Sequence, residues 1–475
     1  MRRAVHTGLV PEWTATISRT AFEEVRHHLL RGEYREHAAF LTAGIARTDR
    51  GTRLLIREVL PVPDTDFTLG EGSYLLSSRA VARASRAARE AGLSLIWAHS
   101  HPGAGNHVGL SLQDHETINR AHPAMLDVVG SPIGALVLSE SGVAGELWEP
   151  GATPSRLAHL RVLGPRIVDL DDGGDQQDAS TSARHARQVL LFGDAGQARL
   201  RKLRVAVLGA GGGGSIIVEQ LARIGVGELW IFDHDRVTSS NLSRIVGSRS
   251  SDALFSRSKV KVARRHVRSI DRSTRVHAES LDVSGARAAL GLTDVDAIFV
   301  ATDTALGRYA ANALAYQYLI PTFQVGAKVQ ADDDGHIDTI HTVSRIAMPG
   351  IPCLHCQGAI PAERLRLEQA GEVERRAQDY LGGGEDVPDP SVISLNSIPV
   401  GLAVTDFMLM FTGLLHDDVD LGARVWYPLE RRSARRVSAA SPGCSWCGHL
   451  SVASCFARGD SWPLPLRQDD VALTA

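Results

Sequence analysis

The chain has 475 residues, which suggests two or three domains at roughly 150 residues each. Its 51 Lys and Arg nearly balance 54 Asp and Glu, giving a formal net charge of −3. We therefore expect neither a nucleic-acid-binding surface nor a polybasic membrane-binding surface. We also expect no secretory signal, and five cysteines in so long a chain exclude a disulfide scaffold and favour a reducing cytoplasm.

In the N-terminal half, apolar spacing predicts one helix over residues 21–31 and a second one that starts after Ser111. Short apolar runs predict strands, because they have the length and composition of buried strands. These runs cover residues 38–44, 54–62, 93–101 and 133–138.

An acidic stretch separates the two halves. Residues 169–182 read DLDDGGDQQDASTS, a composition that cannot bury a core. We therefore expect a first domain over residues 1–165, a linker over 166–182 and a second domain over 183–475. A long surface loop is the alternative to a linker. A second flexible segment is expected over 381–391.

In the C-terminal half, strands alternate with helices, which predicts an α/β domain with a mostly parallel sheet. The apolar stretch over 398–415 contains Pro399 and Asp406, so we expect a buried helix there rather than a membrane span. The expected strands cover residues 204–209, 227–235, 295–303 and 321–330, and the helices cover 215–225, 259–270 and 304–319.

A candidate metal site lies in the first domain. His99 and His101 are two residues apart at the end of a strand, so both imidazoles fall on one face. Asp114 follows Ser111 by three residues in the first turn of a helix and can supply a third ligand. Three protein ligands and a water are the pattern of catalytic zinc. The alternatives are a helix-capping box at Ser111 and a surface pair of histidines.

The combination H-x-H-P followed by S-x-x-D resembles the JAMM (JAB/MPN-type) zinc metalloproteases over about residues 15–160. The resemblance implies a mixed sheet with flanking helices, with His99, His101 and Asp114 as ligands of a catalytic Zn²⁺. It also implies that Ser111 stabilises the oxyanion and that Glu36, in EHAAFLTAG, is the general base. Nine residues separate His101 from Ser111, whereas the usual eukaryotic pattern has seven. His107, inside this longer loop, is expected to be a surface residue, and an inactive relative is the alternative.

A glycine-rich loop opens the second domain. Gly209, Gly211 and Gly214 lie between a strand and a helix, where backbone amides can approach a phosphate. Asp233 closes the next strand and could hold a ribose hydroxyl. These residues alone would equally suit a dehydrogenase.

More specific residues flank this loop: Asn241 and Arg244 follow Asp233 by eight and eleven positions, and Arg187 with Gln188 precedes the loop. These segments resemble the ThiF/MoeB and ubiquitin-activating superfamily, which implies a Rossmann-like doubly wound sheet and ATP. The resemblance implies that Arg244 and Lys259 neutralise the triphosphate and that Asp303 holds Mg²⁺. It further implies that Arg187 reaches the nucleotide of a partner subunit in a homodimer. A Ser replaces the usual glycine three residues before Lys259. The matching residues are Arg187, Gln188, Asp233, Asn241, Arg244, Lys259, Asp303, Arg308 and Asn312.

Two C-x-x-C pairs lie far apart in the second domain, and two such turns can complete a tetrahedral structural zinc site. A pair of redox motifs is the alternative. The two pairs are Cys353 with Cys356 and Cys444 with Cys447.

No cysteine lies between Cys356 and Cys444, where many ubiquitin-activating enzymes carry a thioester-forming residue. Cys455 is expected to be a small buried residue in a strand or tail. We therefore expect adenylation without thioester transfer. An oxyester on a serine of the crossover segment is a hypothesis that remains open, and the serines concerned are Ser391, Ser394 and Ser397.

Together these resemblances imply a bifunctional enzyme: a zinc (iso)peptidase joined to an ATP-dependent adenylyltransferase. Its partner would be a ubiquitin-like protein with a C-terminal glycine, acting with a conjugating enzyme in a bacterial pathway. The alternative partner is a sulfur-carrier protein of cofactor or cysteine biosynthesis. A scaffold with degenerate sites is the alternative to an enzyme. Whether the peptidase matures precursors or removes conjugates stays open.

Overall fold

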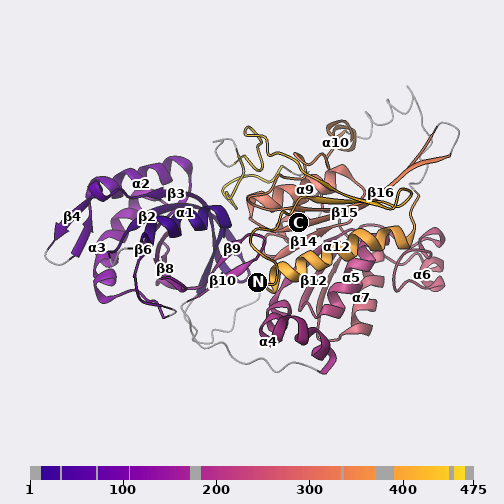
Figure 1. The fold of residues 1–475 in the computed structure, drawn as a ribbon, viewed down its shortest axis with the longest axis horizontal. Helices are drawn as coiled ribbons and strands as arrows, with labels where there is room; N and C mark the ends of the chain where they lie inside the picture. Colours follow the sequence, from indigo (N-terminus) through magenta and orange to yellow (C-terminus); the bar gives the residue numbers. More distant parts are fainter. Residues whose placement is uncertain are drawn as a thin grey trace, which may run out of the picture. The chain divides into compact units, whose positions relative to one another are not determined.

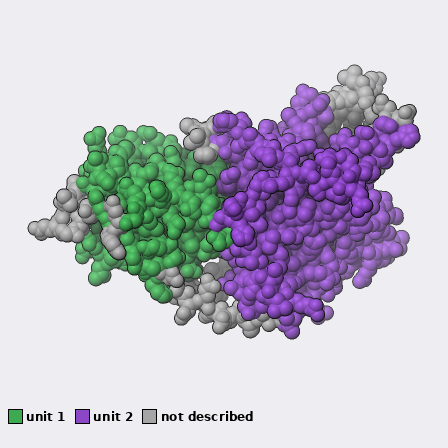
Figure 2. All heavy atoms as spheres, viewed as in Figure 1, with its two compact units in different colours: residues 1–177, 317–319, 455–463 green, residues 178–316, 320–454, 464–475 purple. Residues whose placement is uncertain are grey.

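The computed structural model describes residues 12–32, 35–70, 73–105, 107–171, 183–332, 336–370, 390–448 and 454–465. The chain divides into two compact units (Figure 2). Unit 1 comprises residues 1–177, 317–319 and 455–463, and unit 2 comprises residues 178–316, 320–454 and 464–475. Most of the expected acidic linker, residues 172–182, and of the second flexible segment lies outside the described residues.

Unit 1 is built on an eight-stranded mixed sheet in the order β1-β3-β2-β6-β7-β8-β9-β10 (Figure 1). Because β1 also pairs with β9, the sheet closes on itself. All four predicted strands are present, whereas β1, β8 and β9 were not predicted, and β10 lies within the stretch expected to be a linker. The bounds are β1 Glu12–Ser18, β2 Ala38–Thr48, β3 Gly51–Pro61, β6 Ser94–Ser100, β7 Ile133–Leu138, β8 Val143–Trp148, β9 Ser155–Leu163 and β10 Val168–Leu170, with a hairpin of β4 Phe67–Gly70 and β5 Ser73–Leu76.

In the described part of unit 1, three α-helices cover this sheet. Helix α1 (Arg19–Leu29) starts at Ser18, whose hydroxyl accepts a hydrogen bond from the amide of Ala21, and it buries an apolar face in one core. Helices α2 (Ser78–Ala91) and α3 (Leu112–Val129) lie side by side over a second core (Figure 1). The strand carrying His99 and the helix carrying Asp114 are thereby packed into one body.

A segment from the far end of the chain completes the sheet of unit 1. Strand β2 pairs with β6 only as far as Ala43. Beyond that point the amide of Gly44 donates to the carbonyl of Ala457 at 3.1 Å, and the amide of Asp460 donates to the carbonyl of Ile45 at 2.7 Å. Cys455, at the start of this segment, is buried, as expected.

Unit 2 holds a second eight-stranded sheet, in the order β13-β12-β11-β14-β15-β16-β17-β18. The first five strands are parallel and the last three are added antiparallel. The parallel part has the strand order of a Rossmann-like doubly wound sheet, as predicted. The bounds are β11 Arg204–Leu208, β12 Glu228–Phe232, β13 Arg275–Glu279, β14 Ala297–Val300, β15 Thr322–Ala331, β16 Ile337–Ala347, β17 Ala423–Tyr427 and β18 Arg432–Arg436.

Helix α12 (Ile393–Phe411) crosses α5, β15 and β16 (Figure 1). Within the part of the chain that the structure describes, it is the one helix long and apolar enough to span a membrane, a test that core helices also pass. Its Asp406 pairs with Arg424 of β17. The other helices are α4 Ala186–Lys202, α5 Gly212–Ile224, α6 Ser250–Leu254, α7 Lys259–Ile270, α8 Ala286–Leu290, α9 Ala305–Gln317 and α10 Ala362–Gln369.

Candidate functional site

The structure brings the three predicted metal ligands of unit 1 together. His99 lies in β6, His101 directly follows that strand, and Asp114 lies in the first turn of α3. Asp114 Oδ1 is 3.1 Å from Nε2 of His99, and Asp114 Oδ2 is 3.3 Å from Nε2 of His101. The three ligand atoms all lie within 4.8 Å of one another. We call these residues the triad.

Ser111 and Asp114 also form a capping box, so the alternative reading of this motif holds at the same time. The amide of Asp114 donates to Ser111 Oγ at 3.2 Å, and the amide of Ser111 donates to Asp114 Oδ2 at 2.6 Å. The cap fixes the Asp114 carboxylate at the helix start. It uses a lone pair of the Ser111 hydroxyl and leaves the hydroxyl proton available for donation.

The charges of the triad suit a divalent cation. Burial alone would raise the pKa of Asp114, but hydrogen bonds from His101 and His99 outweigh it and hold that pKa well below its usual range. Because His101 donates this hydrogen bond to the Asp114 carboxylate, the pKa of His101 is raised. Two imidazoles and an ionised carboxylate form a donor set that zinc takes in catalytic sites.

Glu36 lies beside the triad, just before β2. Its Oε1 atom is 3.8 Å from Nε2 of His101, and 55% of its side chain is exposed. A carboxylate in this position can reach a solvent molecule bound at the triad. His107 is exposed, as predicted for a residue of the longer loop.

The glycine-rich loop of unit 2 joins β11 to α5. Gly209 has φ +91°, a conformation that glycine adopts freely. Gly211 precedes the first turn of α5. A Cβ on Gly214 would lie 1.7 Å from the carbonyl oxygen of Gly209, so the helix and the loop approach too closely for any side chain. The first amides of α5 lack helical partners, which suits them to a phosphate.

Asp233 ties this loop to the end of β12. Its Oδ2 accepts from the amide of Ala210 at 2.7 Å, and its Oδ1 accepts from the amide of Asp235 at 2.8 Å. Because a carboxylate oxygen can accept more than one hydrogen bond, the Asp233 carboxylate can still accept one from a ribose hydroxyl.

Arg244 and Lys259 lie on separate segments near the loop. The guanidinium of Arg244 donates to the carbonyl of Ser240 at 2.7 Å, and its Cδ would be 3.3 Å from a Cβ on Gly212. Lys259 Nζ forms an ion pair of 2.7 Å with Asp235. Burial alone would raise the pKa of Asp235, but Lys259 outweighs it and lowers the pKa. Sequence reasoning missed Asp235, although it stands two residues after Asp233.

The other predicted residues lie on segments outside the loop. Asn241 Oδ1 accepts from the amide of Thr238 at 3.2 Å. Asp303 follows β14 and is exposed, while its carbonyl accepts from Arg308 at 3.5 Å. Arg187 is exposed on α4, and no hydrogen bond or ion pair joins it to the loop among the described residues.

Asn396, at the start of α12, was not singled out from the sequence. Its Nδ2 atom would be 2.5 Å from a Cβ on Gly212, so the amide packs directly against the glycine-rich loop. It also donates to Ser391 Oγ at 3.1 Å. The hydroxyl of Ser397 donates to the carbonyl of Ile393 at 2.8 Å, and Ser394 is exposed. Of the crossover serines, Ser391 is therefore linked to the loop through Asn396.

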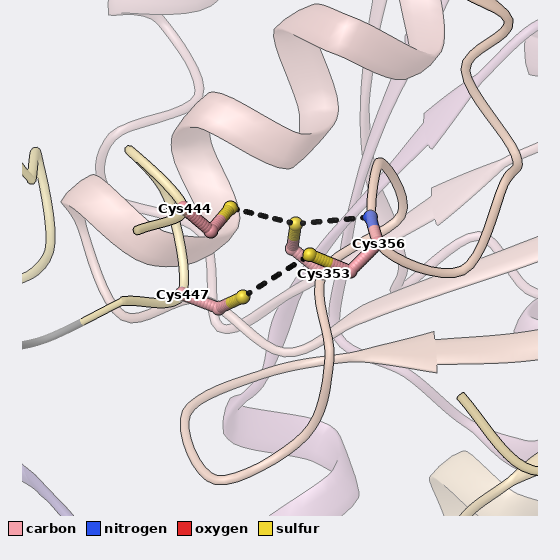
Figure 3. Close-up of side chains that lie close together, drawn as sticks. All are labelled: Cys353, Cys356, Cys444 and Cys447. Carbon is pink, nitrogen blue, oxygen red and sulfur yellow. Dashed lines mark hydrogen bonds between the residues drawn. The ribbon is translucent and has the colours of Figure 1, made fainter. Parts of the chain in front are cut away.

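The four paired cysteines converge in unit 2 (Figure 3). The Sγ atoms of Cys353 and Cys444 are 3.7 Å apart, and those of Cys356 and Cys447 are also 3.7 Å apart. A tetrahedron with Zn–S bonds of about 2.3 Å has edges of about 3.8 Å, so the spacing fits one zinc ion. The pKa of Cys447 is lowered because it accepts a hydrogen bond from Cys353, which favours a thiolate here.

The four paired cysteines form a knuckle, which is anchored to the core of unit 2. The amide of Leu354 donates to Asn312 Oδ1 of α9 at 2.8 Å. Cys353 and Cys356 follow β16, and Cys444 and Cys447 follow β18. One ion would therefore join the loop that follows β16 to the loop that follows β18.

A Rossmann-like sheet, a glycine-rich loop before α5 and a paired-cysteine knuckle define unit 2 as a nucleotide-binding α/β domain. The model of the ThiF family matches residues 185–446, more than half of the chain. The chain therefore belongs to the ThiF family.

Curated relatives also match part of the chain. The Sulfur carrier protein ThiS adenylyltransferase of Bacillus subtilis is 30% identical over 271 residues, which are 56% of this chain and 72% of that protein. The Adenylyltransferase and sulfurtransferase MOCS3 of Caenorhabditis briggsae is 31% identical over 41% of this chain and 46% of its own length. The chain thus spans less than half of that second relative.

Among solved structures, MccB of E. coli with succinimide has 18% identity and a TM-score of 0.45. The likeness covers 56% of this chain and 75% of that one.

Proposed function

We propose that unit 2 adenylates the C-terminal glycine of a sulfur-carrier or other ubiquitin-like protein at the expense of ATP. The observation that carries this proposal is the glycine-rich loop closed against Asp233, with Arg244 beside it, in a member of the ThiF family. The names of these two relatives describe adenylyltransferases, and one of them names a sulfur carrier protein as its substrate.

In this reaction, an oxygen of the partner's terminal carboxylate bonds to the α-phosphorus of ATP. The bond from that phosphorus to the bridging oxygen breaks, and pyrophosphate leaves with the electron pair. Arg244 and Lys259 offset the negative charge, and the amides of α5 bind phosphate oxygens. Mg²⁺ would be held by Asp303 and would offset further phosphate charge.

We further propose that the enzyme works as a homodimer in which Arg187 reaches the nucleotide of a partner subunit. Leu190 and Leu191 lie close to Arg187 on α4 and are 87% and 57% exposed. Exposed leucines beside a functional arginine suit a contact between protomers.

A sulfur carrier is the favoured partner. Relatives include sulfur-carrier adenylyltransferases, and the chain has no cysteine between Cys356 and Cys444 to form a thioester. The second candidate is a ubiquitin-like protein of a bacterial conjugation pathway with a conjugating enzyme. Only the fused unit 1, with its triad, favours it. We place either pathway in the cytoplasm, where the thiols stay reduced.

The test is a pull-down with the full chain and ATP from a lysate of its own source, followed by mass spectrometry of the captured small proteins. A captured protein ending in glycine should support ATP–pyrophosphate exchange when purified. A hydroxylamine-labile adduct on the crossover serines would identify an oxyester. No exchange with any glycine-ended protein would contradict the adenylation proposal.

We also propose that unit 1 is a zinc-dependent (iso)peptidase of the JAMM type. The observation that supports it is the triad, with Glu36 3.8 Å from His101. A zinc ion bound by the triad would supply a Lewis acid that polarises the scissile carbonyl and acidifies water. Glu36 accepts the proton from the attacking water and passes it to the leaving amine. The Ser111 hydroxyl donates to the developing oxyanion.

The test for this second activity is cleavage of the captured partner extended at its C-terminus by a short peptide. Elemental analysis of the full chain should find about two zinc ions, one in the triad and one among the four cysteines. A value near one would mean that one of the two sites is wrongly assigned.

A further inference from the structure

A cleft of about 1350 Å³ opens in unit 1 between α2 and α3. The faces of these two helices form its sides, and Phe40 and Trp97 of the sheet lie at its floor. Glu36, His99 and Asp114 line the same cleft, so it leads to the triad. We call it the α2–α3 cleft.

The cleft is long enough for a stretch of extended chain. Its wall on α3 runs from Asp114 to Val128, which is about 21 Å at 1.5 Å per residue. An extended peptide rises about 3.3 Å per residue, so about six residues would fill this length.

The sides of the cleft carry positive charge that nothing in the described chain neutralises. Arg86 and Arg89 project from α2, and Arg120 projects from α3. All three are exposed, and no ion pair engages any of them among the described residues. By contrast, Arg83 of α2 pairs with Asp66 at 2.6 Å. The acidic residues that line the cleft are Glu36 and Asp114, and both lie at the end next to the triad.

Deeper in the cleft, buried polar atoms lack hydrogen-bond partners among the described residues. Among them are Ser85 Oγ, Trp97 Nε1 and both ring nitrogens of His122. Ser85 is 2% exposed and His122 is fully buried. Buried polar groups in folded proteins are nearly always paired, so these groups point to a ligand with donors and acceptors of its own. A peptide backbone offers both kinds of group.

We propose that the α2–α3 cleft binds an extended, acidic segment of the protein substrate and leads its scissile bond to the triad. Arg86, Arg89 and Arg120 bind its carboxylates, while Ser85, Trp97 and His122 bind its backbone. The placement of the scissile bond rests on the proposed peptidase function, whereas the binding of the segment does not. Substrates with a basic segment at this position are disfavoured, because their charges would face three unpaired arginines.

The probe is a short labelled peptide of glycine, leucine and glutamate, compared with a peptide that has lysine in place of glutamate. Binding to the zinc-loaded full chain is followed by fluorescence anisotropy. We expect the glutamate peptide to bind at least about tenfold more tightly, with an affinity that falls as salt is added. The double variant Arg86→Glu with Arg120→Glu should reverse this preference.

The matched control is Arg79→Glu, on the same helix α2 but outside the cleft, which should keep the preference of the parent protein. Zinc content and melting temperature are measured for each variant, so that a folding defect is separated from a loss of binding. Equal binding of both peptides, or an equal effect of the control, would overturn the proposal. Failure of the peptidase proposal has a different signature: the glutamate peptide binds, but the triad holds no zinc and no substrate is cleaved.

Discussion

A methyl group on Gly214 would lie 1.7 Å from the carbonyl oxygen of Gly209, whereas one on Gly213 would find its nearest neighbour at 3.7 Å. Adjacent glycines of one helix thus differ in what they tolerate. We expect Gly214→Ala to lower the free energy of unfolding by about 3 kcal/mol or more and to abolish ATP-dependent activity. Gly213→Ala, the control, should stay within about 1 kcal/mol of the parent protein. Urea unfolding and pyrophosphate exchange measure the two effects, and equal behaviour would contradict the close approach.

Asp303 is expected to matter for catalysis rather than for stability, because it is exposed at the end of β14. Asp303→Ala should reduce partner-dependent ATP–pyrophosphate exchange on the order of a hundredfold at an unchanged melting temperature. Asp338→Ala, an exposed carboxylate of β16, serves as the control and should leave exchange intact. Normal exchange in the Asp303 variant would refute its role in holding Mg²⁺.

The four-cysteine knuckle should hold one of two zinc ions. Cys447→Ser should lower the zinc content from about two to about one per chain and lower the melting temperature by several degrees. A loss of about 1 kcal/mol shifts the melting temperature of a domain this large by about 2–4 °C. Cys455→Ala removes a cysteine outside the knuckle and should leave the zinc content unchanged. The same zinc content in both variants would argue against a shared site.

Glu36→Gln should slow cleavage of the extended partner by about a hundredfold or more, because a positioned base contributes roughly that factor. Zinc in the triad should remain, since Glu36 is not one of the three ligand residues. His107→Ala, in the same region but exposed, is expected to cleave normally. Unchanged cleavage by Glu36→Gln would remove Glu36 from the mechanism.

Stability of unit 1 should depend on pH through His122. Burial lowers the pKa of His122 to about 4, from about 6.5 in the unfolded chain. Below pH 6.5 His122 becomes protonated in the unfolded chain, whereas in the folded chain it stays neutral down to about pH 4. The free energy of unfolding therefore falls as the pH drops between these values, by about 3 kcal/mol at full extent.

Hydrogen exchange of α3, followed by mass spectrometry, measures this effect. In His122→Phe, the hydrogen exchange of α3 should vary less with pH than it does in the parent protein. His27→Phe, at an exposed position of α1, should not. Parallel curves for all three proteins would show that His122 is not the titrating group.

The sequence predicted metal-site residues best where metal coordination requires two ligands only a few positions apart. The residues of the triad and the four cysteines were named from motifs only a few positions long, and the structure brings each set together. The alternation of strands and helices predicted the parallel sheet of unit 2, because each element there has a clear period. Strands β8 and β9 were missed, although β8 alternates buried and half-buried residues in the manner of a strand.

Contacts between distant segments could not be read from motifs. Asn396 packs against Gly212, but nothing in the sequence near either residue points to the other. The α2–α3 cleft arises from two helix faces whose residues look like ordinary surface positions when each helix is read alone. Asp235, the partner of Lys259, was not predicted, because the family pattern includes Asp233 but not Asp235.

The pairing of residues 457–460 with Gly44 and Ile45 has a practical consequence for dissecting the protein. A fragment that stops at residue 177 would leave that part of β2 with open backbone donors and acceptors in a hydrophobic setting. Such an edge invites association with another chain, so the isolated N-terminal half should aggregate. The peptide covering residues 455–463, supplied in trans, should restore its solubility.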